Sequence, residues 1–498
     1  MAEIRDHYRT IERKAAYPLL SPVEIPEAYG QMETFYSFAA PKIRFEDHGV
    51  EAALDRVLWK VESKTETQVV LAVRIESLDG KALARVVRTY EILPQPAGSS
   101  TTQTSDFALF TRVENLTSGP MSAIYIQQGP VGMAKENARQ EDRHIVAAWW
   151  AEGQILCKGH YRAEAAKKHQ AYLAKDDDTE NQRIAWAAVT NNYFACIMAP
   201  RGRLSPKDPA RFSTLNGITL LENTPDRREA NDLTFQFTTN RLSIPPRGST
   251  EIAFDCYLGP KSKVAFESVE SYRNRDYYGV ISESFSSCTP TALVGLMMSL
   301  LNTFHKIPPH NYGLAIIILV LVVRAALHPI TKKSQVNMMK MQKQQAMLQP
   351  KVAQLREKYA NDRVKMNHEI MEVYREAGIN PAGNILSCLP MMLQIPIWIA
   401  LWTALASTVD MRHAPFDGWW IRDLAGADAI YTFKQAFYIP LIGALMGGPM
   451  ESINLLPILL GISQVLQTRY MPRSTMPQQQ GGGMTDQMEQ QRKMMMFM

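Results

Sequence analysis

The stretch AIIILVLVVRAALHPIT, residues 315–331, constrains the fold of this chain more than any other feature. It is almost entirely apolar, and it would fill the hydrocarbon core of a bilayer as a helix. It nevertheless contains Arg324, whose guanidinium cannot lose its proton to escape an apolar environment. A charge at the centre of a bilayer costs about 2.5 to 3.5 kcal/mol on insertion scales. The pattern therefore predicts a membrane-spanning helix at 311–330 with a charge that needs a physical explanation.

Composition divides the 498 residues into two different halves, since charged residues are common up to about residue 285 and long apolar runs occur only after it. The net charge of +5, from 54 basic and 49 acidic side chains, is too weak to indicate nucleic acid as a specific ligand. The five cysteines lack CxxC spacing, so neither a disulfide framework nor a zinc site is expected; they are residues 157, 196, 256, 288 and 388.

Residues 42–280 are predicted to form an all-β domain, preceded by a linker at 1–41. Short runs rich in β-branched and aromatic residues, such as TQVVLAVRIES (67–77), alternate with Gly, Pro, Asn and Ser, which is typical of a large antiparallel sandwich. One helix is expected at about 162–175. The carboxylates and histidines have no triad or metal-ligand spacing, which indicates a scaffold or binding domain with no cofactor. Asn115-Leu116-Thr117 matches a glycosylation acceptor, a weak signal.

The second half predicts several membrane elements. Residues 281–310 contain one helical apolar face, which indicates an amphipathic helix at the membrane surface or, alternatively, a core helix of the β-domain; the face comprises Leu293, Leu296, Met297, Leu300, Leu301 and Phe304. After the first span at 311–330, further spans are expected at 384–408 and 453–470, and a fourth begins within 494–498.

Loop charges predict the orientation of these spans. Residues 331–380 contain ten Lys and Arg, whereas 409–434, within the loop 409–452, contains three. By the positive-inside rule, 331–380 and the loop 471–493 are cytoplasmic, and 409–452 and the β-domain are periplasmic. A domain exported ahead of its first span needs an anchor, but the chain begins MAEIRDHYRT without an apolar run. We therefore expect an N-terminal helix to be missing from the sequence, and the end at Met498 also looks cut.

The segment 331–380 has the pattern of an antiparallel helical hairpin. Leu348, Val352, Leu355 and Tyr359 repeat at helical spacing, and a second such series follows the polar ANDR; it comprises Met366, Ile370, Val373 and Ala377. The methionines of this segment are interpreted either as packing between the two helices or as an adaptable surface for varied apolar partners.

Two interpretations of Arg324 follow from the residues alone. Its side chain could snorkel to the cytoplasmic headgroups, because Pro329 is only five residues away. Alternatively, it faces a water-filled cavity between helices, where an ionisable residue marks a substrate path. The spans contain no acidic residue that could neutralise it, but they do contain polar groups that could line such a cavity: Gln394, Ser463, Gln464 and Gln467.

At this point the chain resembles a known family, the YidC-type membrane protein insertases. The resemblance is carried by VVRAALHPITKKS, the basic hairpin through NPAGN, CLPMMLQIPIWIALW and NLLPILLG, and also by HAPFDGWWIRDL, IQQGPVG and WAAVTNNYFACI. It implies a periplasmic β-supersandwich of the sugar-mutarotase type, followed by an α-helical transmembrane core in the inner membrane. That core has a hydrophilic groove, and Arg324 falls on the groove arginine of the family.

The resemblance further implies a non-enzymatic insertase and chaperone without cofactors. Its partners would be nascent membrane proteins, the lipid bilayer, the Sec translocon and the ribosome. Client contact is then expected at the groove, comprising Arg324 and the four polar residues above, and at hairpin methionines: Met338, Met341, Met347, Met366 and Met371. The alternatives are a membrane-anchored carbohydrate-binding or carbohydrate-modifying protein and a small transporter or channel.

Overall fold

The computed structural model forms two compact units, which are described separately below. The first comprises Met1–Ser287 with Leu405–Arg412, and the second comprises Cys288–Ala404 with His413–Met498. The structure describes residues 2–4, 17–26, 32–77, 79–94, 105–135, 143–151, 154–162, 170–175, 183–202, 211–221, 231–282, 291–359, 362–376, 381–416, 420–421, 423–437 and 450–470.

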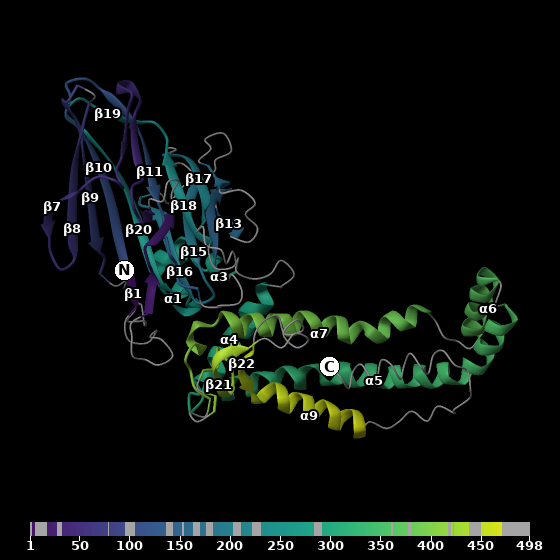
Figure 1. Cartoon of the computed structure of the whole chain (residues 1–498). Coiled ribbons are helices and arrows are strands. Elements are labelled where there is room, and N and C mark those ends of the chain that lie inside the picture. The colour runs from purple at the N-terminus through teal and green to yellow at the C-terminus, as the bar shows by residue number, and fades with distance from the viewer. Residues whose placement is uncertain are drawn as a thin grey trace. The chain divides into compact units, whose positions relative to one another are not determined.

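The first unit contains two large antiparallel sheets (Figure 1). The order in the nine-stranded sheet is β13 (Gln154–Arg162), β12 (His144–Ala151), β15 (Arg183–Thr190), β16 (Phe194–Pro200), β20 (Ser249–Pro260), β10 (Ser105–Asn115), β9 (Ala82–Ile92), β8 (Gln68–Glu76) and β7 (Lys60–Lys64). The order in the seven-stranded sheet is β14 (Gln170–Ala174), β17 (Phe212–Leu221), β18 (Asn231–Thr239), β11 (Met121–Gln128), β5 (Lys42–Phe45) and β6 (Val50–Ala53), with β19 (Leu242–Ile244) paired to β11.

Alternation of side chains explains why these strands form a sandwich. On β11, Met121, Ala123 and Tyr125 are buried while the residues between them are partly exposed. They share one core with residues of the opposite sheet, such as Leu109 and Val113 on β10. The prediction of a sheet-rich first half is therefore confirmed, and its interior is filled by apolar side chains.

The N-terminal residues differ from the predicted linker at 1–41. Short strands occur there, namely β1 (Ala2–Ile4), β2 (Tyr17–Leu20), β3 (Val23–Pro26) and β4 (Met32–Phe35). Leu19, Leu20 and Phe38 belong to the main core. A backbone hydrogen bond from Ser21 N–H to Gly132 O, 2.9 Å long, attaches this segment to the loop after β11. The described residues 17–26 and 32–41 are therefore part of the β-domain.

One local prediction in the β-domain is wrong, and one weak motif match has another explanation. Gln170–Ala174 is a strand, not the second half of a helix, because its pairing with β17 overrides local helix propensity. Asn115 is only 2% exposed, and its side-chain Nδ2 donates to Gly119 O at 2.8 Å and to Pro245 O at 3.1 Å. These bonds close a turn, so the glycosylation motif has a structural explanation.

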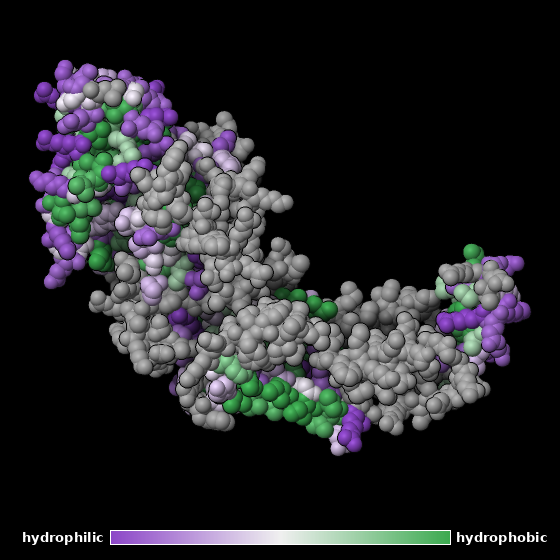
Figure 2. Space-filling model, viewed as in Figure 1, coloured by the Kyte–Doolittle hydropathy of each residue, from purple (hydrophilic) through white to green (hydrophobic). Residues whose placement is uncertain are grey.

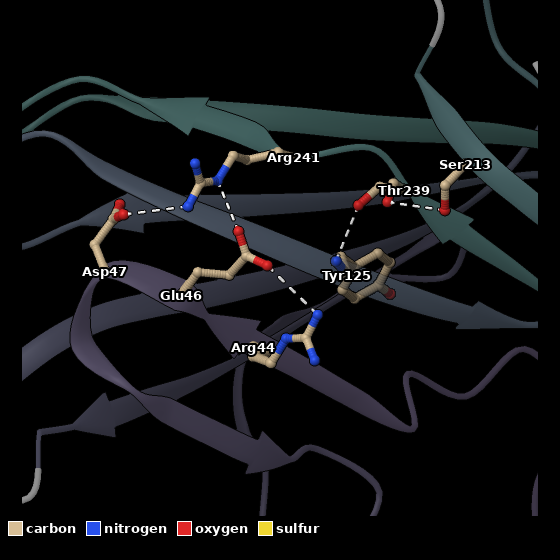
Figure 3. Close-up of polar contacts among 7 residues, drawn as sticks. All are labelled: Arg44, Glu46, Asp47, Tyr125, Ser213, Thr239 and Arg241. Carbon is tan, nitrogen blue, oxygen red and sulfur yellow. Dashed lines mark hydrogen bonds and ion pairs between the residues drawn. The ribbon is translucent and has the colours of Figure 1, made fainter. Parts of the chain in front are cut away.

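A charged network lies where η1 (Glu46–His48) meets the turn between β18 and β19 (Figure 3). Glu46 accepts from Arg241 at 2.7 Å and from Arg44 at 3.4 Å, and Asp47 contacts Arg241 at 3.5 Å. Because these side chains are largely exposed, the network contributes little stability. To the right of this network in Figure 3, Tyr125 N–H donates to Thr239 Oγ1 at 2.9 Å, a hydrogen bond that connects β11 to the end of β18.

Three short helices complete the first unit: α1 (Lys263–Ser268), α2 (Glu270–Asn274) and α3 (Gly279–Ser282). Their aromatic side chains pack with those of the nine-stranded sheet, as in the contacts of Tyr257 with Phe266 and Tyr272. Tyr272 Oη donates to Asp106 Oδ2, and Arg275 pairs with Asp255 at 2.6 Å. Burial raises the pKa of Asp106 to about 6, against the lowering effect of the Tyr272 hydrogen bond.

The second unit is helical, with α4 (Thr291–His305), α5 (Tyr312–Lys358), α6 (Arg363–Glu376), α7 (Pro381–Ser407) and α9 (Leu455–Tyr470). The turn η3 (Val409–Met411), which follows α7, belongs to the first unit. In the second unit β21 (Ala429–Phe437) pairs with β22 (Met450–Asn454) within the predicted loop 409–452. The predicted loop 471–493 and the start of a span at 494–498 lie outside the described residues.

Helix α5 continues through the expected boundary at residue 330. It contains Pro329 and Pro350, yet it runs for 47 residues. Between Gly313 and Gly378 there is no glycine, and Lys, Gln, Met and Ala, which are strong helix formers, dominate the segment after the first proline. The predicted span and the first arm of the predicted hairpin are therefore one helix (Figure 1).

Helix α4 packs on α5 and belongs to the helical unit, so the alternative of a core helix in the β-domain is wrong. Its buried residues are Val294, Met297, Met298 and Leu301, whereas Leu296, part of the predicted apolar face, is 51% exposed. Within the described residues, Tyr312–Lys333 is long and apolar enough to cross a membrane, and Gln394–Ser407 and Leu455–Gln467 are shorter apolar stretches.

We predict that the β-domain loses stability as the pH rises from 4 to above 6. Asp106 binds its proton more tightly in the folded chain than in the unfolded chain. Its contribution to the free energy of unfolding is therefore complete below the unfolded pKa of about 3.8 and is lost as the pH rises through the folded pKa of about 6. Asp106→Asn should remove this pH dependence, on the order of 2 kcal/mol, in urea unfolding monitored by tryptophan fluorescence. Asp79→Asn, at an exposed position, is the control and should leave the profile unchanged.

Candidate functional site

Helix α5 carries Arg324 at a defined depth. The helix begins after Asn311, whose side-chain oxygen accepts from Leu314 N–H at 3.1 Å, and Arg324 follows twelve positions after Tyr312. At 1.5 Å per residue, this places its Cα about 18 Å along the helix axis. The side chain is exposed, and within the described part of the chain it has no hydrogen bond or ion pair. Its charge is thus available to solvent, lipid or a partner.

The other predicted groove residues are exposed on α7 and α9. Gln394 lies on α7, and Ser463, Gln464 and Gln467 lie on α9. Ser463 Oγ donates to Leu460 O at 2.8 Å, within its own helix. Among the described side chains, no contact joins Arg324 to any of these four residues. Their assembly into one groove therefore stays a prediction.

Helix α9 exposes apolar side chains along its length, including Leu456, Leu460 and Leu466. Figure 2 shows this helix as a green apolar surface that ends in a polar tip. A surface of this kind is stable in water only when something apolar covers it. The lipid tails of a bilayer would provide that cover.

The predicted helical hairpin is formed by the end of α5 and by α6, which pack against each other. Val352 is buried, and its neighbours on the same face, Leu348 and Leu355, are partly buried. On α6, Ile370 and Val373 are likewise partly buried. Asp362 caps α6 by accepting from Lys365 N–H at 3.1 Å, and the preceding two residues of the predicted polar turn ANDR lie outside the described residues.

Some methionines of the hairpin fit an adaptable surface for apolar partners, and another fits packing between the two helices. Met347 is 74% exposed and Met371 is 59% exposed, so both are available to a partner. Met366 is partly buried, as expected for packing between helices. The side chains of Met338 and Met341 lie outside the described set.

The described residues contain no group of three or more His, Cys, Asp or Glu side chains placed to hold a metal ion. Cys196 and Cys256 are buried in the sheet core, and burial raises the pKa of both thiols. The candidate site therefore stays a prediction, and its described members are the exposed side chains of Arg324, Gln394, Ser463, Gln464, Gln467, Met347 and Met371.

Sequence reasoning missed a set of polar residues at the other end of the helices. His413 and Asp423 form a buried pair, with Nδ1 and Oδ2 3.0 Å apart. Asp428 accepts from Leu456 N–H at the start of α9. The only sequence signal was HAPFDGWWIRDL, which contributed to the family resemblance without assigning roles to its residues.

Comparison with known proteins agrees with this reading of the second half. A family model described as 60Kd inner membrane protein matches residues 303–498, the region that contains Arg324, the hairpin and α9. These residues are thus similar to the 60Kd inner membrane protein family. The predicted resemblance to YidC-type insertases is confirmed by the relatives below.

Three relatives are each named membrane protein insertase YidC. The protein of Geobacter metallireducens is 32% identical over 299 residues, 59% of this chain and 45% of the relative. That of Lawsonia intracellularis is 32% identical over 310 residues, which are 60% of this chain and 48% of the relative. That of Nitratidesulfovibrio vulgaris is 28% identical over 361 residues, which are 70% of this chain and 54% of the relative. The chain thus spans about half the length of the relatives it matches.

Similar solved structures include an active YidC insertase crystallised with its first transmembrane domain resolved, at 14% identity. It covers 94% of this chain and 88% of its own, with a TM-score of 0.28. An aldose epimerase homologue from C. elegans covers 49% of this chain and 93% of its own, at 9% identity and the same TM-score. Superpositions this poor add nothing to the description of the fold.

The packing of the hairpin leads to a prediction. Val352→Asp would bury a charge without a partner between α5 and α6, so α6 should separate from α5. Amide hydrogen exchange of peptides from 363–376 should then accelerate at least tenfold, about 1.4 kcal/mol of lost protection. Gln354→Asp, on the exposed face of the same turn, should leave exchange unchanged. Equal exchange in the two variants would show that the α5–α6 contact does not hold the hairpin together.

Proposed function

We propose that this chain inserts nascent membrane proteins into the inner membrane and assists their folding. The observation that carries the proposal is Arg324, a permanent cation without an ion-pair partner among the described residues, on a helix apolar enough to cross a bilayer. The helix lies in the region matched to the 60Kd inner membrane protein family, and relatives of this chain are named membrane protein insertase.

The physical task of an insertase is to lower the cost of moving a polar segment through hydrocarbon. A hydrophilic groove that reaches part of the way across the bilayer shortens the apolar distance that such a segment must cross. Arg324 would attract acidic or polar parts of a client there, and the proposed lining of Gln394, Ser463, Gln464 and Gln467 would hydrate them. The apolar part of the client would then leave sideways into lipid. These steps form no covalent bond, so no catalytic residue or cofactor is required.

The hairpin would receive the client first. Exposed methionines such as Met347 and Met371 suit client segments of different sequence, because the side chain is flexible and polarisable. We include Met338, Met341 and Met366 in this proposed contact. The ten basic side chains of 331–380 support a place beside the phosphate-rich ribosome, and the family resemblance supports cooperation with the Sec translocon.

The proposed topology places residues 331–380 in the cytoplasm and the β-domain in the periplasm. Its support is the excess of Lys and Arg in 331–380 over 409–434, ten against three. In this arrangement the span 311–330 presents Arg324 nearer to its cytoplasmic end, and the spans 384–408 and 453–470 accompany it. The β-domain then acts as a scaffold on the opposite side.

The proposed function predicts how Arg324 variants behave. In cells depleted of their own insertase, Arg324→Ala should reduce insertion of a small single-spanning client about tenfold, since a charge-assisted contact contributes about 1.5 kcal/mol. Arg324→Lys keeps the positive charge and should retain most of the activity. Insertion is measured by protease protection of the client at matched protein levels. Equal insertion by all three proteins would assign Arg324 to snorkelling, and no insertion by the unmutated chain would reject the insertase function.

The proposed topology is tested by labelling cysteines from one side of the membrane. With the five native cysteines replaced by alanine, Leu58→Cys and Met347→Cys each place one thiol at a very exposed position, 99% and 74% respectively. A membrane-impermeant maleimide added to cells with a permeable outer membrane should label Leu58→Cys only. Met347→Cys should react after the inner membrane is opened. Labelling of both sites, or of Met347→Cys alone, in intact inner membranes would contradict this topology.

A further inference from the structure

The described residues of 413–428, which we call the clasp, form a folded unit around one buried carboxylate. Asp423 Oδ1 accepts from His413 N–H at 2.8 Å and from Ala425 N–H at 2.9 Å, and its Oδ2 lies 3.0 Å from His413 Nδ1. His413 has a φ of 60°, a backbone conformation that residues other than Gly rarely adopt. The Asp423 carboxylate therefore stabilises this strained turn through hydrogen bonds with His413 and with Ala425.

Backbone hydrogen bonds close the clasp on itself. Leu424 N–H donates to Ala414 O, and Phe416 N–H donates to Ile421 O, each at 2.9 Å. The two sides of the loop are thus paired, and the position of Phe416 is set by the loop. A segment held in this way can act as a rigid connector between the elements that it touches.

The clasp holds the start of α5 by two contacts. Asn311 caps the helix with its oxygen, and its Nδ2 donates to Phe416 O at 2.9 Å. The Phe416 ring also lies directly over Gly313, because a Cβ built at Gly313 would lie 2.0 Å from Phe416 Cδ2. Only a residue without a side chain permits this approach.

The clasp also holds the start of α9. Asp428, its last residue, accepts from Leu456 N–H, and Trp420 Nε1 donates to Asp428 O at 3.3 Å. The pairing of Ala429 with Asn454 brings the two segments together. A carboxylate at a helix N-terminus satisfies a free amide and interacts favourably with the helix dipole.

We propose that the clasp is a positioning device that sets Arg324 and the polar residues of α9 at the same depth. Arg324 is twelve residues after Tyr312, the first residue of α5, and Gln467 is twelve residues after Leu455, the first residue of α9. With both helices starting at one loop, each residue lies about 18 Å from it along its helix. Asp423, Asp428 and Asn311 are positioning residues that act through the two helices. This proposal rests on the proposed insertase function.

The test measures geometry and insertion on the same protein. The full chain with native cysteines replaced by alanine carries spin labels at Ala326→Cys and Leu466→Cys, both exposed positions near the depth of Arg324 and Gln467. It is reconstituted in lipid vesicles at equal protein amounts, and the label-to-label distance distribution is measured by pulsed electron paramagnetic resonance. Insertion of a small client is followed in the same vesicles.

Asp428→Ala should broaden the distance distribution and lower insertion about fivefold, the effect of losing an N-cap of about 1 kcal/mol. Asp428→Asn keeps an acceptor for Leu456 N–H and should restore both readouts. Gly313→Ala should act like Asp428→Ala because it displaces Phe416, whereas Gly461→Ala, at a helix position where a Cβ meets nothing within 4 Å, is the matched control.

Each result decides one of the two proposals. Three results would overturn the positioning role. In Asp428→Ala, either the distance distribution broadens while insertion is unchanged, or insertion falls while the distribution is unchanged. The third is that Asp428→Asn fails to restore both the distribution and the insertion. If the unmutated chain inserts no client, the insertase function fails, while the distance measurement still shows whether the clasp orients the helices.

Discussion

A charge that cannot be neutralised, on a helix apolar enough to cross a membrane, is the constraint on which the proposed function depends. A buried lysine or aspartate can change its protonation state to reduce the cost of burial, but an arginine cannot. The cost of Arg324 is offset only by water, lipid headgroups or an anionic partner. The proposed groove provides the water, the cytoplasmic membrane surface provides the headgroups, and a client provides the anionic partner. The proposed role of the polar residues on α7 and α9, hydration of a groove, depends on the presence of that charge.

The free amides at helix N-termini explain the arrangement at the opposite end of these helices. Each helix begins with N–H groups that have no partner within the helix, and these groups need acceptors. Asn311 and Asp428 supply such acceptors at the starts of α5 and α9, and both are connected through the clasp. Because α5 also forms the first arm of the hairpin, one continuous helix joins the clasp, Arg324 and the hairpin.

The β-domain uses its buried polar groups to hold its own segments together. Arg88 donates to Phe38 O at 2.6 Å and holds Phe38 at a φ of 60°, while Arg143 pairs with Asp232 at 2.7 Å. Asn115 closes a turn in the same manner. Since these side chains are occupied with internal contacts, they are not available for chemistry. This use of polarity supports the scaffold role proposed for the domain.

The sequence by itself determined the sheet-rich first half, the helical second half, the pairing of α5 with α6, and the resemblance of the second half to YidC-type insertases. These features follow from periodicity, charge counts and local motifs, which depend on neighbours in the chain. Only the tertiary structure decided that Leu19, Leu20, Phe38 and Ala40 join the β-core, that 170–174 is a strand, and that α5 passes through Pro329 without ending. It alone brought His413 to Asp423, Phe416 to Gly313 and Asp428 to Leu456. The reason is physical: these outcomes depend on contacts between residues far apart in the chain, and no local pattern specifies which distant partner satisfies a given amide, carboxylate or apolar face.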